Sequence, residues 1–304
     1  MTFLKGRALL LYLFLCAVWG STWLVIKIGL EDLPPLRFAG YRMALACLLL
    51  APFAFRRGGK VPTRRETFFI AANGFLQIGL CYALVFIASQ WIPSGLAALF
   101  FATFPIWVGL FAHFLLPGEP LTLRTLLAAG LGVLGVAVIE GPAAAGALGS
   151  RTWGLVAGGA MVLGSAVISG YSNVLVKKHL GSVPPALNVR GQTLIGAAFL
   201  LLCAALLERG RPAVWTTSAV ASLAYLALFG TALTFVGLFW LIPRVPVSVV
   251  GTIPLVDTLI AILLGAWILG EKLSARVLVG GLLILSGVAL AVRARPARAV
   301  PNVP

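Results

Sequence analysis

Long apolar runs separated by short polar breaks fill most of the chain. Crossing a hydrocarbon core about 30 Å thick takes roughly 20 apolar residues of helix. Prolines stand at several breaks, where the missing amide proton and fixed φ suit the first turn of a new helix. The pattern predicts an all-α integral membrane protein with ten transmembrane helices, near residues 8–30, 34–55, 67–91, 93–116, 122–140, 152–178, 184–207, 217–242, 246–269 and 274–293.

Composition agrees with this pattern. Of 304 residues, 61% are hydrophobic and 10% are charged, against about 25% charged residues in soluble domains. The net charge of +15 comes from basic residues between the apolar runs, and not from a basic stripe with interleaved aromatics, so no nucleic-acid partner is expected. The four cysteines lie inside apolar runs without paired spacing. We therefore predict no disulfide and no metal site, and we expect no cofactor. The expected partners are membrane lipid and a small-molecule substrate.

The distribution of basic residues predicts the orientation. If the N-terminus is cytoplasmic, the loops and tails on that side carry 14 lysines and arginines, and those on the other side carry 5. Cytoplasmic loops of membrane proteins are enriched in these residues. Both termini are therefore predicted to be cytoplasmic, in a multi-pass protein of the cell inner membrane.

The two halves of the chain resemble each other. The segment 19–42 returns in weaker form at 169–192, where Lys177 and Pro184-Pro185 repeat Lys27 and Pro34-Pro35 at an offset of 150. We predict two repeats, residues 1–146 and 147–293, followed by a cytoplasmic tail at 294–304 that is expected to be disordered. Each repeat has five predicted helices, an odd number, so the second enters the membrane in the opposite sense. Inverted repeats of this kind are typical of alternating-access transporters.

Several local motifs carry a family resemblance. They are Trp19-Gly20 in helix 1, Arg42 in helix 2, the stretch from Pro105 to Glu119, and the glycine-rich run 128–139. Together they resemble two EamA domains of the drug/metabolite transporter superfamily, over nearly the whole chain. Overall likeness is greatest to the YddG-type amino-acid exporters, which implies export of amino acids. The chain departs from the family pattern in helix 9, where Asp257 occupies the place that matches Pro105.

Polar and aromatic side chains inside the predicted spans are candidates for a substrate cavity. A polar group in the apolar membrane interior is costly, so we expect each one to have a hydrogen-bond partner or a function. Asn73 and Gln77 share one helix face, and the indole N–H of Trp19 near mid-membrane needs an acceptor. Hydrogen bonds between helices are the alternative for the amides, and lipid or core contact is the alternative for the aromatic stripe of helix 4. The predicted cavity comprises Trp19, Trp23, Asn73, Gln77, Tyr82, Phe101, Trp107, Tyr171, Asn173 and Phe235.

Prolines and ionisable groups complete the candidate residues. Pro105 and Pro254 are predicted hinges, since a proline inside a span frees a backbone carbonyl. Asp257 and His113 are candidates for proton coupling, with a structural hydrogen-bonding role as the alternative. Arg42 lies two turns into helix 2, and we expect it to reach toward the outer surface.

The sequence favours a secondary transporter. It has no P-loop, no H-E-x-x-H and no convincing hydrolase set, so no enzyme activity is expected. The alternatives are a membrane-embedded enzyme acting on a lipid-linked substrate, or an exporter of other metabolites or drugs. Relatives that exchange multidrug cations use a glutamate in helix 1, which has no acidic residue here, and Arg42 and Arg190 are expected near opposite faces rather than grouped for a sugar phosphate. We predict export of small neutral or zwitterionic metabolites, amino acids above all, including aromatic and hydrophobic ones, by alternating access.

Overall fold

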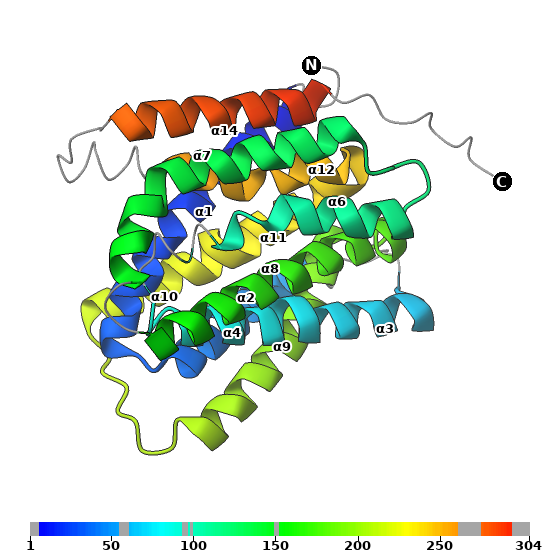
Figure 1. Cartoon of the computed structure of the whole chain (residues 1–304). Coiled ribbons are helices and arrows are strands. Elements are labelled where there is room, and N and C mark those ends of the chain that lie inside the picture. Colours follow the sequence, from blue (N-terminus) through cyan, green and yellow to red (C-terminus); the bar gives the residue numbers. More distant parts are fainter. Residues whose placement is uncertain are drawn as a thin grey trace.

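The computed structural model describes residues 6–54, 61–92, 97, 100–148, 152–260 and 275–293, and its elements are helices that run roughly alongside one another (Figure 1). The described part of the first half begins with α1 (Arg7–Asp32) and α2 (Pro35–Ala54). Next come α3 (Arg64–Asn73), the π-helical segment η1 (Gly74–Leu80) and α4 (Cys81–Ala88), which continue one another. Then follow α6 (Phe104–Leu115) and α7 (Leu123–Leu148).

The second half has a matching order. It begins with α8 (Thr152–His179) and α9 (Pro185–Leu207). A third long helix consists of α10 (Thr217–Ala227), the π-helical segment η2 (Leu228–Leu233), α11 (Thr234–Leu241) and the 3₁₀ turn η3 (Ile242–Arg244). The short α12 (Val247–Gly251) precedes a helical stretch at 253–260, and α14 (Ala275–Arg293) is the last described helix. The predicted tail at 294–304 lies outside the described residues.

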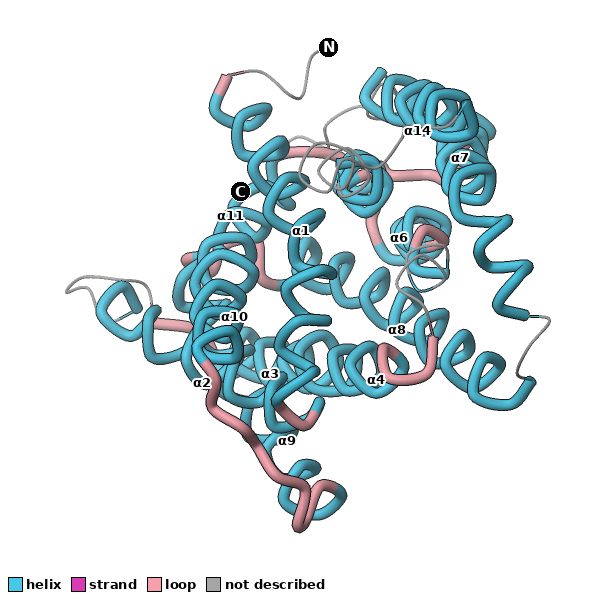
Figure 2. Tube along the Cα trace, turned by 90° about the vertical axis from the view of Figure 1, so that its left-hand side faces the viewer, coloured by secondary structure: helices cyan, strands magenta, loops and turns pink. Residues whose placement is uncertain are grey.

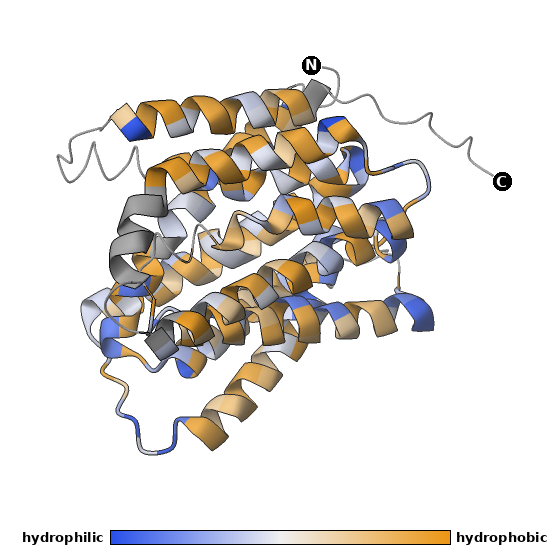
Figure 3. Ribbon diagram, in the orientation of Figure 1, coloured by the Kyte–Doolittle hydropathy of each residue, from blue (hydrophilic) through white to orange (hydrophobic). Residues whose placement is uncertain are grey.

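The helices have the length and surface of a membrane protein. Within the described residues, six helices of 19 to 28 residues are long and apolar enough to cross a membrane, and shorter apolar helices lie at Phe104–Leu115, Leu123–Ile139, Val247–Ile260 and Ala275–Ala291. Figure 3 shows hydrophobic residues along the length of the helices and hydrophilic ones gathered near their ends. Such a surface suits hydrocarbon in the middle and water at both ends.

Small residues allow some helices to approach closely. The helices α7 and α14 lie side by side in Figures 1 and 2. A Cβ atom built on Gly280 would lie 2.5 Å from the carbonyl oxygen of Gly135, and one built on Gly135 would lie 2.6 Å from that of Gly280. Contact of this kind between backbones is a common way for helices to associate in lipid.

The two π-helical segments occupy matching places in the two halves. A π-helical turn widens the helix and alters its hydrogen-bond pattern, and such turns are frequent at functional sites. The segment η2 packs against α2, and η1 packs against α9. The second helix of each half therefore reaches the π-helical segment of the other half, and each segment buries several of its residues.

Breaks between helical segments lie beside both of the prolines predicted as hinges. Turn residues at 102–103 precede α6, with Pro105 in its first turn. Thr252 likewise forms a turn before the helical stretch at 253–260, which has Pro254 in its first turn. A Cβ atom built on Gly251 would lie 3.3 Å from Cα of Pro105, so the two breaks face each other. Pro254, rather than Asp257, therefore holds the structural place of Pro105, which corrects the expected match.

Candidate substrate cavity

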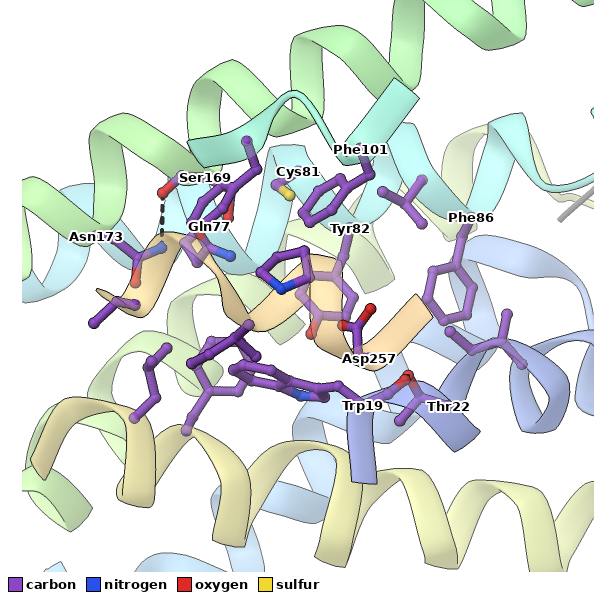
Figure 4. Close-up of a pocket in the computed structure, with 18 of the residues that line it drawn as sticks. Trp19, Thr22, Gln77, Cys81, Tyr82, Phe86, Phe101, Ser169, Asn173 and Asp257 are labelled. Atoms are coloured by element: carbon purple, nitrogen blue, oxygen red, sulfur yellow. Dashed lines mark hydrogen bonds between the residues drawn. The ribbon is translucent and has the colours of Figure 1, made fainter. Parts of the chain in front are cut away.

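A cavity lies between helices from both halves of the chain (Figure 4). Its walls come from the helical elements α1, α2, η1, α4, α8 and α11 and from the segments around the two proline breaks. The empty space amounts to about 840 Å³, which includes the part open to the surroundings. The predicted residues that border it are Trp19, Gln77, Tyr82, Phe101, Asn173, Phe235, Pro254 and Asp257.

Aromatic rings form much of the wall. The ring of Phe235 meets that of Trp19 edge to face, with centroids 5.7 Å apart, and lies 6.4 Å from that of Tyr82. On another side, Phe101 and Phe104 stack with centroids 5.8 Å apart. The indole N–H of Trp19 donates a hydrogen bond to the carbonyl oxygen of Gly230 at 3.3 Å, which satisfies this polar group inside the apolar interior.

Two amide oxygens in the cavity lack a partner within the described structure. The Nδ2 of Asn173 donates to the carbonyl oxygen of Ser169 at 2.8 Å, drawn as a dashed line in Figure 4, and this bond sets the orientation of the amide. Its Oδ1 and the Oε1 of Gln77 are buried without a hydrogen bond. A buried unsatisfied acceptor costs about 1–3 kcal/mol. A bound molecule with N–H or O–H groups would recover that cost.

Arg42 also borders the cavity, and the expectation that it reaches toward the outer surface is wrong. Its side chain is 1% exposed. The guanidinium bonds to η2, with Nε donating to Thr231 Oγ1 at 2.8 Å and Nη2 donating to the Gly230 carbonyl oxygen at 2.9 Å. Its carbon Cζ lies 5.1 Å from the ring centroid of Tyr82, as in a cation–π contact. Sequence reasoning singled out Arg42 but missed its place in the cavity wall, although its depth in the helix was a signal.

Asp257 enters the cavity from the segment after the proline break (Figure 4). It is buried, and the hydroxyl of Thr258 lies 3.4 Å from its Oδ1. Among the described residues, no basic side chain forms an ion pair with it. Its place in the wall is consistent with either of the two predicted roles, proton coupling or structural hydrogen bonding.

Other predicted residues lie away from this cavity. Asn73 donates from Nδ2 to Oε1 of Gln192 on α9 at 2.9 Å, so its amide joins two helices. The indole of Trp107 donates to Thr103 Oγ1 at 3.2 Å, and the ring of Tyr171 packs against Phe111 with centroids 5.3 Å apart. The side chain of Trp23 lies outside the described part of the structure.

His113 does not reach the cavity either. It stands in the last turn of α6, exposed, and its Nδ1 accepts a hydrogen bond from the backbone N–H of Leu121 at 3.2 Å. This contact ties the end of the helix to the loop that follows. Of the two predicted proton-coupling residues, the structure therefore brings Asp257 alone to the cavity wall.

An ion pair ties three segments together at one end of the helices. Lys177 near the end of α8 places its Nζ 2.6 Å from Oε1 of Glu119 and donates to the carbonyl oxygen of Val245 at 2.5 Å. The other carboxylate oxygen of Glu119 accepts from the backbone N–H of Val247, at the start of α12, at 2.9 Å. Both charged side chains are less than one-fifth exposed. Glu119 thus binds both a basic side chain and a backbone amide.

A cavity between apolar helices, in a chain that is largely helical over its described residues, is typical of membrane transport proteins. The chain belongs to the EamA-like transporter family, whose model matches residues 6–141 and 156–293. It is 33% identical to the uncharacterized transporter YvbV of Bacillus subtilis strain 168, over 94% of this chain and 92% of that protein. It is 28% identical to the uncharacterized inner membrane transporter YedA of Escherichia coli K12, over 84% and 81%.

Two further comparisons bear on substrate and fold. A protein of Streptantibioticus cattleyicolor named a probable terminal-alkyne amino-acid exporter is 27% identical, over 90% of this chain and 89% of its own. A solved crystal structure superposes with a TM-score of 0.76, covering 93% of this chain and 95% of that chain at 21% identity. This last likeness shows the fold, and the three named relatives are all called transporters or exporters.

Proposed function

We propose that the protein is a secondary transporter that exports small zwitterionic or neutral metabolites, most of all amino acids with aromatic or other hydrophobic side chains. The observation that carries the proposal is the cavity of aromatic rings with a few buried polar groups. Rings offer apolar area to a side chain, while a few polar groups fix the orientation of a ligand. The family and the amino-acid exporter named above support the same reading. We also propose that, within its family, the chain is most similar to the YddG-type amino-acid exporters.

The proposed mechanism is alternating access in the cytoplasmic membrane, without cofactor or enzyme activity. The ten predicted spans would form two inverted repeats, residues 1–146 and 147–293, with both termini in the cytoplasm. The π-helical segments and proline breaks at matching places in the two halves support this arrangement. Pro105 and Pro254 would act as hinges, because the backbone beside them is free of regular helical bonds.

The proposed orientation predicts which loops face outside. In a variant without native cysteines, Arg211→Cys in intact cells should react with a membrane-impermeant maleimide. Lys178→Cys, equally exposed at the opposite end of its half, should react only after the cells are permeabilised. The reverse labelling pattern would invert the topology and remove the argument for export from the cytoplasm.

A second prediction concerns energy coupling. Proton-driven export needs a buried group that gains and loses a proton in each cycle, and Asp257 in the cavity is the natural candidate. Neither Asp257 nor His113 has an ionisable mate in the other repeat, so we expect facilitated transport. Counterflow by Asp257→Asn and His113→Gln should stay within a few-fold of wild type, and an imposed pH gradient should not drive uphill accumulation. Uphill movement that Asp257→Asn abolishes would make Asp257 the coupling residue.

Export itself can be tested in cells. A strain expressing the chain should release labelled phenylalanine and leucine, after preloading, several-fold faster than a strain carrying the empty vector. Labelled uridine and ethidium serve as controls for nucleoside and drug export. Faster release of either control with unchanged release of amino acids would replace this proposal with the alternative of an exporter of other metabolites or drugs.

A further inference from the structure

Arg42 brings a positive charge into the protein interior without a counter-ion from the chain as described. It is among the largest fully buried side chains, and none of the described carboxylates forms an ion pair with it. A guanidinium stays protonated in proteins. Burying an uncompensated charge costs several kcal/mol. A charge kept in this place calls for an anion beside it, and no described carboxylate forms an ion pair with it.

The hydrogen bonds of Arg42 leave one edge of the guanidinium free. Of its five N–H donors, the Nε–H binds Thr231 and one Nη2–H binds Gly230, so three remain. Nη1 is buried and has no hydrogen-bond partner among the residues that the structure describes. The edge formed by Nη1 and Nη2 is the planar fork that binds both oxygens of a carboxylate. Arg42 is one of the residues that border the cavity, so its guanidinium lies beside the space that a ligand would occupy.

The surrounding structure holds the guanidinium in place. Thr231 and Gly230 belong to η2 of the second half, and the Gly230 carbonyl also accepts the indole N–H of Trp19. A Cβ atom at position 230 would lie 3.1 Å from Nη2, so glycine leaves room for the arginine. The ring of Tyr82 lies beside the group. An anchor fixed before the ligand arrives loses little entropy on binding.

We propose that Arg42 binds the carboxylate of the transported molecule through its Nη1 and Nη2 edge. The inference rests on the proposed function and narrows it. The cargo must carry a carboxylate, as an α-amino acid does, and an amine or amide of the same shape is rejected. The aromatic wall formed by Trp19, Tyr82 and Phe235 would then receive the side chain of the cargo.

The test compares ligands that carry the carboxylate with ligands that lack it. Binding to the purified full-length protein is measured by isothermal titration for L-phenylalanine, L-phenylalaninamide, 3-phenylpropionate and phenethylamine, and counterflow is measured with labelled phenylalanine. We expect each amide or amine to bind at least tenfold more weakly than its carboxylate counterpart. In Arg42→Gln, phenylalanine binding should fall at least tenfold and the preference should vanish. Arg37→Gln is the matched control, since Arg37 lies on the same helix and binds backbone carbonyls outside the cavity.

Thr231→Val covers the case in which Arg42→Gln does not fold. It removes one anchor of the guanidinium and should weaken phenylalanine binding several-fold while leaving phenylalaninamide unchanged. Equal binding of phenylalanine and its amide to wild type would overturn the role of Arg42 and leave amino-acid export standing. Binding of 3-phenylpropionate that depends on Arg42, without transport of phenylalanine, would keep the anchor and overturn amino-acid export. Failure of all four probes to bind would overturn both.

Discussion

Replacing Trp19 with alanine should lower amino-acid flux at least tenfold. The indole forms part of the cavity wall, packs on Phe235 and donates to Gly230 beside Arg42. A buried tryptophan covers about 150–250 Å² of apolar surface. At about 25 cal/mol per Å², the free energy lost with even part of that area exceeds the 1.4 kcal/mol that corresponds to a tenfold change in flux. Trp19→Phe keeps a ring and should retain most of the flux.

Trp215→Ala is the matched control for this experiment. Trp215 is half exposed and packs against Tyr41, outside the cavity. Gln77→Ala should also reduce flux strongly, because Gln77 borders the cavity, whereas exposed Gln90→Ala should not. Flux is measured by counterflow at equal amounts of folded protein, checked by size-exclusion chromatography. Equal losses in the cavity variants and their controls would assign Trp19 and Gln77 a purely structural role.

Breaking the ion pair between Glu119 and Lys177 should open one end of the transporter. The pair joins the loop after α6, the end of α8 and the start of α12. Surface ion pairs contribute about 0–1 kcal/mol, and breaking a buried pair costs about 3–5 kcal/mol. Because this pair is partly buried, we expect its contribution to lie between these values. A change of about 1.4 kcal/mol shifts the ratio of two conformations tenfold. Glu119→Gln should therefore lower the ratio of the conformation closed at this end to the open one about tenfold.

Cys81 provides a reporter for this prediction, because its thiol is native and borders the cavity. With the other three cysteines replaced by serine, a small thiol reagent applied to inside-out vesicles should label Cys81 about tenfold faster in Glu119→Gln than in the parent. Lys177→Gln should act similarly, and the double variant should add little, since both remove one interaction. Arg244→Gln is the control at the same end. Unchanged labelling in both single variants would mean that the pair does not hold this end closed.

The helices could be predicted from sequence because lipid leaves few choices. A span must satisfy its backbone hydrogen bonds internally and match the bilayer in length, so apolar runs and prolines locate the helices well. The start of α2 at Pro35 and of α9 at Pro185 illustrates this. The π-helical segments had no such signal, because they depend on packing between α2 and η2 and between α9 and η1.

The cavity was less predictable, because a polar residue in a membrane can turn to a neighbouring helix as readily as to a ligand. Gln77 and Asn73 lie one turn apart, yet Asn73 bonds to Gln192 while Gln77 borders the cavity. The break before α6 places Phe101 and Phe104 in the wall and leaves Trp107 out. Arg42 is buried because η2 supplies its acceptors, and that segment lies almost 190 residues away in sequence.

Counterflow in proteoliposomes tests the central claim most directly. Vesicles containing the purified protein are loaded with unlabelled phenylalanine, leucine, uridine or ethidium and diluted into the labelled form of the same compound. The account predicts transient accumulation of labelled phenylalanine and leucine, absent from protein-free vesicles and reduced at least tenfold by Trp19→Ala. Accumulation of uridine or ethidium without that of either amino acid, or amino-acid flux that Trp19→Ala leaves unchanged, would contradict it.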